Sequence, residues 1–249
     1  MFRVQNFVGR LATPDDAERI IDFYVRHIGT TSAITKALKF TEADSRARYS
    51  QKIKSALPDG LSLVVIDEKT KEIVGSSVAT IWHRDPAKNS PAIPPETSKA
   101  KLLYNICDTL ESHFWSLCPE KVNTVIRGEF LLIRSDLRRM KIGSLLTSYL
   151  KGKSVKMIGY DGYVGVATSY ANLMNMEKMG AIPLAEISYE EYFKVNGIPF
   201  EGVFTDGTTK ASLHFIPTEY DEHFEPKVSV SVSTTQNQNI CAFFCKKSP

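Results

Sequence analysis

Apolar residues recur at helical spacing in several stretches of the chain, and the polar residues around them mark where helices begin and end. Thr13-Pro14-Asp15-Asp16 is typical of a helix start, because Thr13 can cap the helix and the two acids favour the positive end of its dipole. Gly180 is expected to close another helix in the left-handed conformation. The pattern predicts helices over residues 13–28, 41–56, 102–117, 142–150 and 170–179.

Shorter runs rich in β-branched and aromatic residues predict strands between these helices. Residues 61–66 and 73–82 flank the charged segment DEKTKE and are expected to form a hairpin. The full set of predicted strands is 2–11, 61–66, 73–82, 125–133, 163–167, 182–192 and 211–216. This order indicates one mixed α/β domain over residues 1–224. Residues 225–249 are rich in Ser, Thr, Gln and Asn, and form either an edge strand through VSVSVS or a loosely ordered tail.

The composition of the 249-residue chain is that of a globular protein, because 43% of its residues are hydrophobic and 24% are charged. No apolar run reaches the roughly 18 residues that a membrane span needs, so we expect no membrane contact. The segment MFRVQNFVGR lacks the apolar core of a signal peptide, and the four cysteines include no CxxC pair. Both observations favour a cytoplasmic protein with reduced thiols. The formal charge of +3 suits a small anionic ligand without demanding a nucleic acid.

The basic turn within residues 131–146 is the most informative chemical feature of the sequence. It joins an expected buried strand to an amphipathic helix and carries Arg138, Arg139 and Lys141. Backbone amides at a helix start lack intrahelical partners and lie at the positive end of the dipole, so this turn can hold a diphosphate. The residues alone fit a solvated basic face at a helix start equally well. The sequence here matches neither a Walker loop nor a GxGxxG dinucleotide fingerprint.

This turn resembles the acetyl-CoA motif of the GNAT N-acetyltransferases, an Arg/Gln-x-x-Gly-x-Gly/Ala loop behind a strand. Arg138 matches the first position of the motif and Gly143 the last, whereas Lys141 replaces the expected glycine. The blocks FTEADSRARYSQKIKSALPDGLSLVVID, GEFLLIRSDLRRMKIGSLL, ATSYANLMNMEKMGA, EISYEEY and FTDGTTKASLHF together resemble the insect and nematode arylalkylamine N-acetyltransferase-like branch. The resemblance covers residues 8–216. It implies a central, mostly antiparallel sheet that is splayed in the middle and flanked by helices.

The resemblance implies that acetyl-CoA is the co-substrate and that pantetheine lies between the strands of residues 129–135 and 163–168. Lys141 has a Cβ where the motif has none. Either its backbone is right-handed and tolerates the Cβ, or coenzyme affinity is reduced, and the lysine can also contact phosphate. The expected coenzyme-binding residues are Leu132, Ile133, Arg138, Arg139, Met140, Lys141, Gly143, Ser144 and Asn172. No metal is expected.

Acetyl transfer to an amine needs donors at the oxyanion and an acid for the departing thiolate. Met176 occupies the position at which many relatives have a tyrosine acid. The arylalkylamine branch is similar in carrying a serine-bearing turn, and Ser169 matches its first serine, whereas the second falls on Asn172. We therefore expect Ser169 to be catalytic, while Asn172 donates or accepts hydrogen bonds without relaying a proton.

A small primary amine is mostly ammonium at neutral pH, so the reaction also needs a base. Ser32 lies where the branch carries a glutamate beside the amine. Glu129 is the expected substitute base, and its alternative role is an ion pair with Arg127 or Arg134. His113 is a further candidate base that is better explained by packing on an amphipathic helix.

Three functions remain open at this point. The first is an acetyl-CoA-dependent N-acetyltransferase for a small primary amine such as an arylalkylamine. The second is a catalytically degenerate relative that binds acyl-CoA without turnover, which Ser32, Lys141, Asn172 and Met176 favour. The third and weakest is a nucleic-acid-binding module, because residues 134–156 carry seven basic residues against one acid but only Tyr149 as an aromatic.

Overall fold

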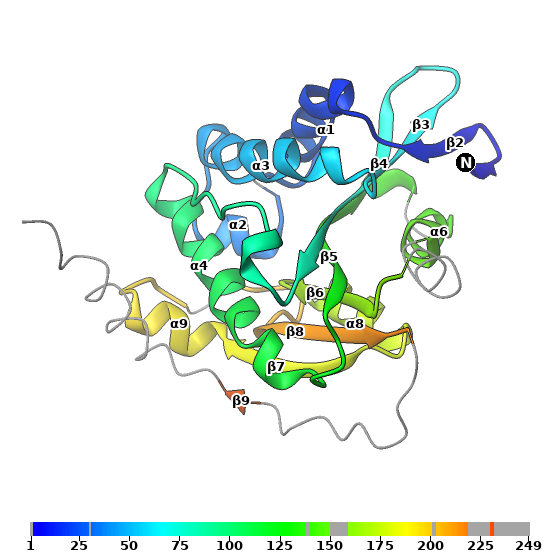
Figure 1. The fold of residues 1–249 in the computed structure, drawn as a ribbon. Coiled ribbons are helices and arrows are strands. Elements are labelled where there is room, and N and C mark those ends of the chain that lie inside the picture. The colour runs from blue at the N-terminus through cyan, green and yellow to red at the C-terminus, as the bar shows by residue number, and fades with distance from the viewer. Residues whose placement is uncertain are drawn as a thin grey trace, which may run out of the picture.

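A mixed β-sheet with helices on both faces forms the framework of the fold (Figure 1). The computed structural model describes residues 2–29, 31–137, 140–149, 159–200, 203–218 and 230–231. The strands are β1 (Phe2–Val4), β2 (Phe7–Leu11), β3 (Leu63–Asp67), β4 (Ile73–His83), β5 (Thr124–Ile133), β6 (Gly162–Ala167), β7 (Ile182–Ser188), β8 (Lys210–Pro217) and β9 (Val230–Ser231). Their spatial order is β1-β2-β3-β4-β5-β6-β8-β7-β9. Neighbours are antiparallel except β5–β6 and β7–β9.

Helices pack on the two faces of this sheet in two groups. One face carries α1 (Ala17–Tyr24), α2 (Ala33–Ala37), α3 (Glu42–Ala56), α4 (Ser98–Ser112), α5 (Phe114–Leu117) and α9 (Tyr189–Val195). The opposite face carries α6 (Ile142–Tyr149) and α8 (Tyr170–Lys178), and Figure 1 shows α6 across the sheet from α3. Single 3-10 turns are η1 (Pro14–Asp16), η3 (Leu57–Asp59), η4 (Pro86–Lys88) and η5 (Ser135–Leu137), and η2 (Val25–Gly29) is a π-helical turn. None of the described helices is both long and apolar enough to cross a membrane.

Successive residues of the central strands supply the cores on the two faces. Val64 packs under α1 and α3, whereas its neighbour Val65 packs on the α6 side. Val164 and Tyr163 divide in the same way between the α4 side and the α6 side. This follows from the two-residue period of a strand, and it explains why both strands read as near-continuous apolar runs in the sequence.

Local sequence signals account for most element boundaries. The Thr41 amide donates to Asp44 at 2.8 Å and the Asp44 amide donates to the Thr41 hydroxyl at 3.2 Å, a capping box that starts α3 where the sequence predicts. Gly180 follows α8 with φ of 71°, which confirms the predicted left-handed closure. The predicted hairpin of residues 61–82 is confirmed as the antiparallel pair β3–β4.

Three predicted elements need correction. Residues 2–11 form two short strands with a turn between them, and residues 102–117 form two helices, α4 and α5. The predicted strand over 182–192 is wrong beyond Ser188, because α9 begins at Tyr189. The Ser188 hydroxyl accepts the Glu191 amide at 3.4 Å, and Tyr189, Tyr192 and Phe193 bury one helical face. Of the 225–249 segment only Val230–Ser231 is described, paired with β7, and the remainder lies outside the described residues.

His214 is a buried histidine without a hydrogen-bond partner among the described residues. It lies on β8, is 1% exposed, and neither ring nitrogen is bonded. Burial, with a smaller contribution from the positive charge of Lys210, lowers its pKa to about 4. The neutral ring is therefore the form that the fold accepts.

We expect the free energy of unfolding to fall by about 1–2 kcal/mol between pH 8 and pH 5 because of His214. Its folded pKa lies below the unfolded value of about 6.5, so the unfolded chain binds the proton first and stability is lost as the pH falls. Urea unfolding at both pH values measures this change. A His214→Gln variant should lose that part of the pH dependence, and an unchanged dependence in the variant would contradict the assignment.

Candidate functional site

A gap opens where the parallel strands β5 and β6 stop pairing. Their register runs from Ile126–Tyr163 to Gly128–Gly165 and ends there, although both strands continue. A cavity of about 580 Å³ lies along this gap, lined from β5 by residues 128–133 and from the other side by Val166, Thr168 and the start of α8. The predicted splay in the middle of the sheet is therefore confirmed. We call this space the strand-gap cavity.

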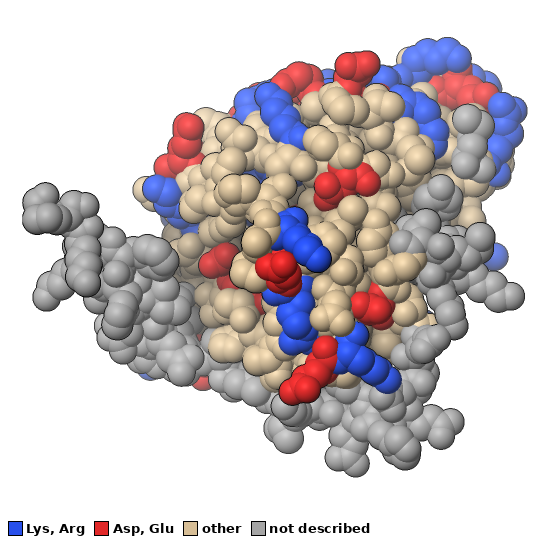
Figure 2. Space-filling model, viewed as in Figure 1, with Lys and Arg blue, Asp and Glu red and all other residues tan. Residues whose placement is uncertain are grey.

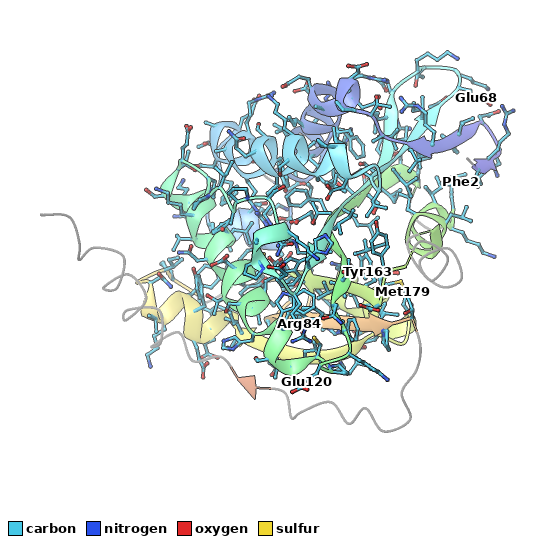
Figure 3. All side chains as sticks on the ribbon, viewed as in Figure 1. Phe2, Glu68, Arg84, Glu120, Tyr163 and Met179 are labelled. Carbon is cyan, nitrogen blue, oxygen red and sulfur yellow. The ribbon has the colours of Figure 1, made fainter. Side chains whose placement is uncertain are left out.

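Gly128, the last β5 residue in the β5–β6 ladder, is required by the packing around it. A Cβ at this position would collide with the hydroxyl and ring of Tyr163, which lies on β6 (Figure 3). Gly165 has no such requirement, because a Cβ there would meet Tyr163 and Met176 at ordinary contact distances of 3.5–3.6 Å. No bulge occurs at Gly165 in the β6–β8 register either. The position at which the two strands require a glycine is therefore Gly128 on β5, and not Gly165 on β6.

One end of the strand-gap cavity reaches the basic turn that the sequence singled out. Leu132, Ile133, Lys141 and Gly143 all line it, and the first turn of α6 begins at Ile142. The helix therefore directs its positive end toward this part of the cavity. Met140 packs against the core on the α6 side rather than lining the cavity.

Three further residues of this turn are expected to bind the coenzyme. Arg138 and Arg139 lie outside the described residues, and of Ser144 only the backbone, within α6, is described. Lys141 has φ of 61°. The right-handed alternative for Lys141 is therefore wrong: a residue with a Cβ holds a left-handed conformation that glycine adopts more easily. The backbone of Lys141 is therefore strained, and the glycine that the motif has at this position would avoid that strain.

The opposite wall is formed by the start of α8. Ser169 caps this helix, since its hydroxyl accepts the Asn172 amide at 3.3 Å, and both residues line the cavity together with Asn175. Met176 is 4% exposed and belongs to the core on the α6 side. Ser32 also lines the cavity, where it caps α2 by accepting the Thr35 amide at 3.3 Å.

The Glu129 carboxylate lies at a β-bulge, on the face of the sheet that α3 and α4 cover. Val78 pairs with Phe130 and Ala79 with Gly128, so Glu129 is the extra residue of β5. Its side chain is 3% exposed and accepts from Lys52 Nζ at 2.5 Å and Arg127 Nε at 2.7 Å. The sequence-based alternative of an ion pair with Arg127 is confirmed, whereas Arg134 pairs with Asp136 at 2.7 Å instead.

Four charged side chains form a compact cluster at this point, and we call it the charge cluster: Lys52, Glu111, Arg127 and Glu129. Arg127 joins the two acids, because its second contact is with Glu111 Oε2 at 3.4 Å. The two positive and two negative charges balance, which makes their burial tolerable.

The two carboxylates of the charge cluster differ in acidity. Burial alone would raise the pKa of Glu129, but the positive charges of Lys52 and Arg127 and a hydrogen bond from each of Lys52 and Thr80 lower it to about 2. Burial raises the pKa of Glu111, and the negative charge of Glu129 raises it further against the opposing charges of Lys52 and Arg127. Glu129 is therefore a permanent anion, and Glu111 is the carboxylate with more affinity for a proton.

A second cavity of about 350 Å³ reaches the same cluster from the α4 side, and we call it the α4-side cavity. Its wall includes Trp82, Tyr104 and Asp108. The residues that line both cavities are Lys52, Cys107, Glu111 and Glu129. Two separate spaces thus meet at one group of acids and bases, an arrangement in which two reactants can approach each other from different sides.

Sequence reasoning missed Lys52 and Glu111, and it had a signal for only one of them. Lys52 lies on the same face of α3 as the buried residues Ser45 and Tyr49. A lysine at a position where the helical period predicts a core residue was the available signal. Glu111 is an ordinary polar position near the end of α4. His113 ends that helix and lines neither cavity. In the part of the chain that the structure describes, no group of His, Cys, Asp or Glu side chains is arranged to hold a metal.

Comparisons with known proteins identify the fold. No protein-family model and no curated protein sequence matches the chain. Among solved structures, a protein of the mosquito Aedes aegypti assigned as arylalkylamine N-acetyltransferase 7 matches with a TM-score of 0.70 and 14% identity over 86% of this chain and 88% of that one. Arylalkylamine N-acetyltransferase 2 of the same mosquito matches with a TM-score of 0.65 and 17% identity over 86% of this chain and all (100%) of that one.

A third match extends the comparison to another amine. The polyamine N-acetyltransferase of Drosophila melanogaster, which forms N-acetylagmatine, has a TM-score of 0.59 and 14% identity over 85% of this chain and 99% of that one. At these identities the similarity is one of fold. The expected fold class, a helix-flanked and mostly antiparallel sheet of the GNAT type, is therefore confirmed.

Replacing Gly143 tests whether the strand-gap cavity holds coenzyme A. Its position leaves room for one methyl group, since a Cβ would lie 3.7 Å from Ile133. A Gly143→Trp variant should lose coenzyme affinity on the order of a hundredfold, because overlap with a ligand in a packed site costs about 1–3 kcal/mol or more.

Gly143→Ala is the matched control and should bind nearly as well as the wild type. Titration calorimetry measures both affinities, and thermal unfolding verifies that both variants fold. Equal affinity of the folded Trp variant and the wild type would remove this turn from the coenzyme site.

Proposed function

We propose that this chain, which has the fold of the GNAT N-acetyltransferases, transfers the acetyl group of acetyl-CoA to a small primary amine. The observation that carries the proposal is the meeting of two cavities at Glu111 and Glu129. The strand-gap cavity takes the coenzyme and the α4-side cavity takes the amine. The thioester carbon and the amine nitrogen then meet beside two carboxylates of different acidity.

The coenzyme site follows the length of the strand-gap cavity. Leu132 and Ile133 lie on the edge of β5 that no described strand covers beyond Gly128, so their main-chain groups can bond the pantetheine amides. The first amides of α6, including those of Gly143 and Ser144, and the charge of Lys141 would hold the pyrophosphate. Arg138, Arg139 and Met140 complete this proposed set from the sequence motif, and Asn172 faces the cavity from α8.

The lining of the α4-side cavity supports an amine with an aromatic part. Trp82 and Tyr104 contribute aromatic rings to the wall, with Phe114 stacked on Trp82 at 5.2 Å and Arg127 5.0 Å from its ring centre. Asp108 lies one turn before Glu111 on α4. Aromatic rings and carboxylates together suit a cationic arylalkylamine.

Two free thiols, Cys107 and Cys118, fit the proposed cytoplasmic location.

The proposed mechanism divides the work between the two acids. Glu129, with its low pKa, stays ionised and attracts the ammonium group, while Glu111 accepts the proton that the ammonium must lose. The amine nitrogen then bonds to the thioester carbon and the carbon–sulfur bond breaks. The nitrogen loses a second proton during the transfer, and Ser169 at the start of α8 is the proposed group that passes a proton to the departing thiolate. Coenzyme A leaves as the thiol, and one proton reaches the solvent.

The second candidate function is binding of acyl-CoA without turnover. It is favoured by specific residues, because Ser32 caps α2 where the resembled branch has a glutamate, and Met176 is a core residue where many relatives have a tyrosine. Under this alternative the strand-gap cavity still binds coenzyme A, and the charge cluster is only structural.

An assay of acetyl-CoA consumption against tryptamine-, phenethylamine- and polyamine-type acceptors distinguishes the two functions. The proposed function predicts turnover with at least one primary amine, measured as release of the coenzyme thiol. Coenzyme binding by calorimetry with no turnover across the panel would select the second candidate. Absence of coenzyme binding would reject both.

Exchanging each carboxylate for its amide tests the division of roles. Glu111→Gln should lower kcat about a hundredfold or more and remove the rise of rate with pH, because the base must be deprotonated to act and its pKa is raised. Glu129→Gln should mainly raise KM for the amine, on the order of tenfold, because it removes one charged contact. Steady-state kinetics from pH 5 to pH 9 measure both effects.

Glu120→Gln, at an exposed position after α5 (Figure 3), is the control for a change of charge alone. The reverse result, in which Glu129→Gln abolishes the rise with pH and Glu111→Gln does not, would return the base to Glu129, as the sequence indicates. Equal loss in all three variants would remove both roles.

A further inference from the structure

Arg48 is a buried cation for which the described part of the chain supplies no anion. It lies on α3, is 7% exposed, and lines the strand-gap cavity. One terminal nitrogen donates to Cys107 Sγ at 3.6 Å, and the guanidinium lies 5.2 Å from the centre of the Phe130 ring. The other terminal nitrogen is buried and has no hydrogen-bond partner among the described residues. Lys52, one turn later on the same helix, is by contrast paired with Glu129.

Such a guanidinium needs a ligand. Arginine does not lose its proton in a protein, so it cannot escape the penalty of burial by becoming neutral as lysine or histidine does. Sulfur and an aromatic face are weak partners for a positive charge compared with a carboxylate. A carboxylate in the cavity beside Arg48 would offset the burial of the charge, and a shift of the guanidinium toward it would give the buried nitrogen a partner.

The position of Arg48 within the cavity indicates which part of a ligand it meets. Its contacts, Cys107 and Phe130, lie beside Glu129, at the end of the cavity away from Lys141 and Gly143. A coenzyme whose pyrophosphate lies at the basic turn brings its acyl group to this end. Arg48 lines the strand-gap cavity and is not part of the α4-side wall, so it faces the donor rather than the amine.

The segment that borders the cavity near Arg48 also favours a negatively charged ligand. Residues 23–41 contain no Asp or Glu. From this segment Ser32, Ile34 and Thr35 line the cavity near α3. This segment therefore adds hydroxyl groups and no acid to the wall, while the two acids of the cavity are already paired, Glu129 with Lys52 and Arg127 and Glu111 with Arg127.

We propose that Arg48 binds a carboxylate on the acyl chain of the donor, so that the preferred donor is a coenzyme A monothioester of a short dicarboxylic acid, such as malonyl- or succinyl-CoA. This inference rests on the proposed function, because it assumes acyl transfer from coenzyme A in the strand-gap cavity. The same bonds form and break as in acetyl transfer. The amine nitrogen bonds to the thioester carbon, the carbon–sulfur bond breaks, and coenzyme A leaves as the thiol. The distal carboxylate keeps its charge throughout.

Calorimetric titration of the full chain with coenzyme A, acetyl-CoA and succinyl-CoA tests the proposal without any variant. Succinyl-CoA should bind on the order of tenfold to a hundredfold more tightly than acetyl-CoA, the range expected for one charged hydrogen-bonded contact. Equal affinities for the two esters would overturn the inference and leave the proposed function intact. No affinity for any of the three would overturn the proposed function itself.

A variant then assigns the preference to Arg48. In Arg48→Met the two esters should bind with equal affinity, because the contact to the distal carboxylate is gone. Arg46→Met on the same helix is the matched control, because the Arg46 side chain is 44% exposed and pairs with Asp22 at the surface, and it should keep the preference. A preference for succinyl-CoA that persists in a folded Arg48→Met variant would remove Arg48 from the site.

Kinetics distinguish a donor carboxylate from an acceptor carboxylate. The second source of a carboxylate is an amino-acid acceptor, so kcat/KM is compared for succinyl-CoA with phenethylamine and for acetyl-CoA with phenylalanine. The proposal expects the first pair to be favoured and this advantage to vanish in Arg48→Met. An Arg48-dependent preference for phenylalanine, with equal use of the two donors, would overturn the donor assignment.

Discussion

The end of backbone pairing between β5 and β6 is the constraint on which the rest of the site depends. Beyond Gly128 and Gly165 both strands continue, but no described strand bonds to the facing edge of β5. Backbone amides and carbonyls on such an edge need partners, and here they border the strand-gap cavity. The separation thus creates the space for an extended ligand and also supplies the polar groups that would bind it.

The same strand brings the charge cluster to the junction of the two cavities. Arg127 and Glu129 both come from β5, while Lys52 and Glu111 reach them from α3 and α4. Acidic and basic groups are also interspersed over the face of the molecule in Figure 2, where neither sign forms a continuous field. The charge cluster, in contrast to this face, lies inside the protein, where charges interact more strongly than they do in water.

Patterns along the chain predict the framework better than the site. Capping at Thr41 and the left-handed Gly180 are local, so the sequence reveals them directly. The helix after Ser188 was missed because alternating acids and tyrosines also fit a strand, although the spacing of Ser188 and Glu191 was a usable capping signal. Glu111 was missed for a different reason. Its role depends on contacts with β5 across the fold, and no local spacing encodes them.

The bulge on β5 also reverses the alternation of the strand partway along its length. Arg127 and Glu129 face the helices α3 and α4, and Phe130 directly follows on that same side against Tyr24 and Tyr49. Odd-numbered residues of β5 face these helices up to residue 129, and even-numbered residues face them after it. Loss of the extra residue, Glu129, would restore regular alternation and leave Gly128 and Phe130 on their present faces, so the bulge fits one additional carboxylate into the strand without turning its neighbours over.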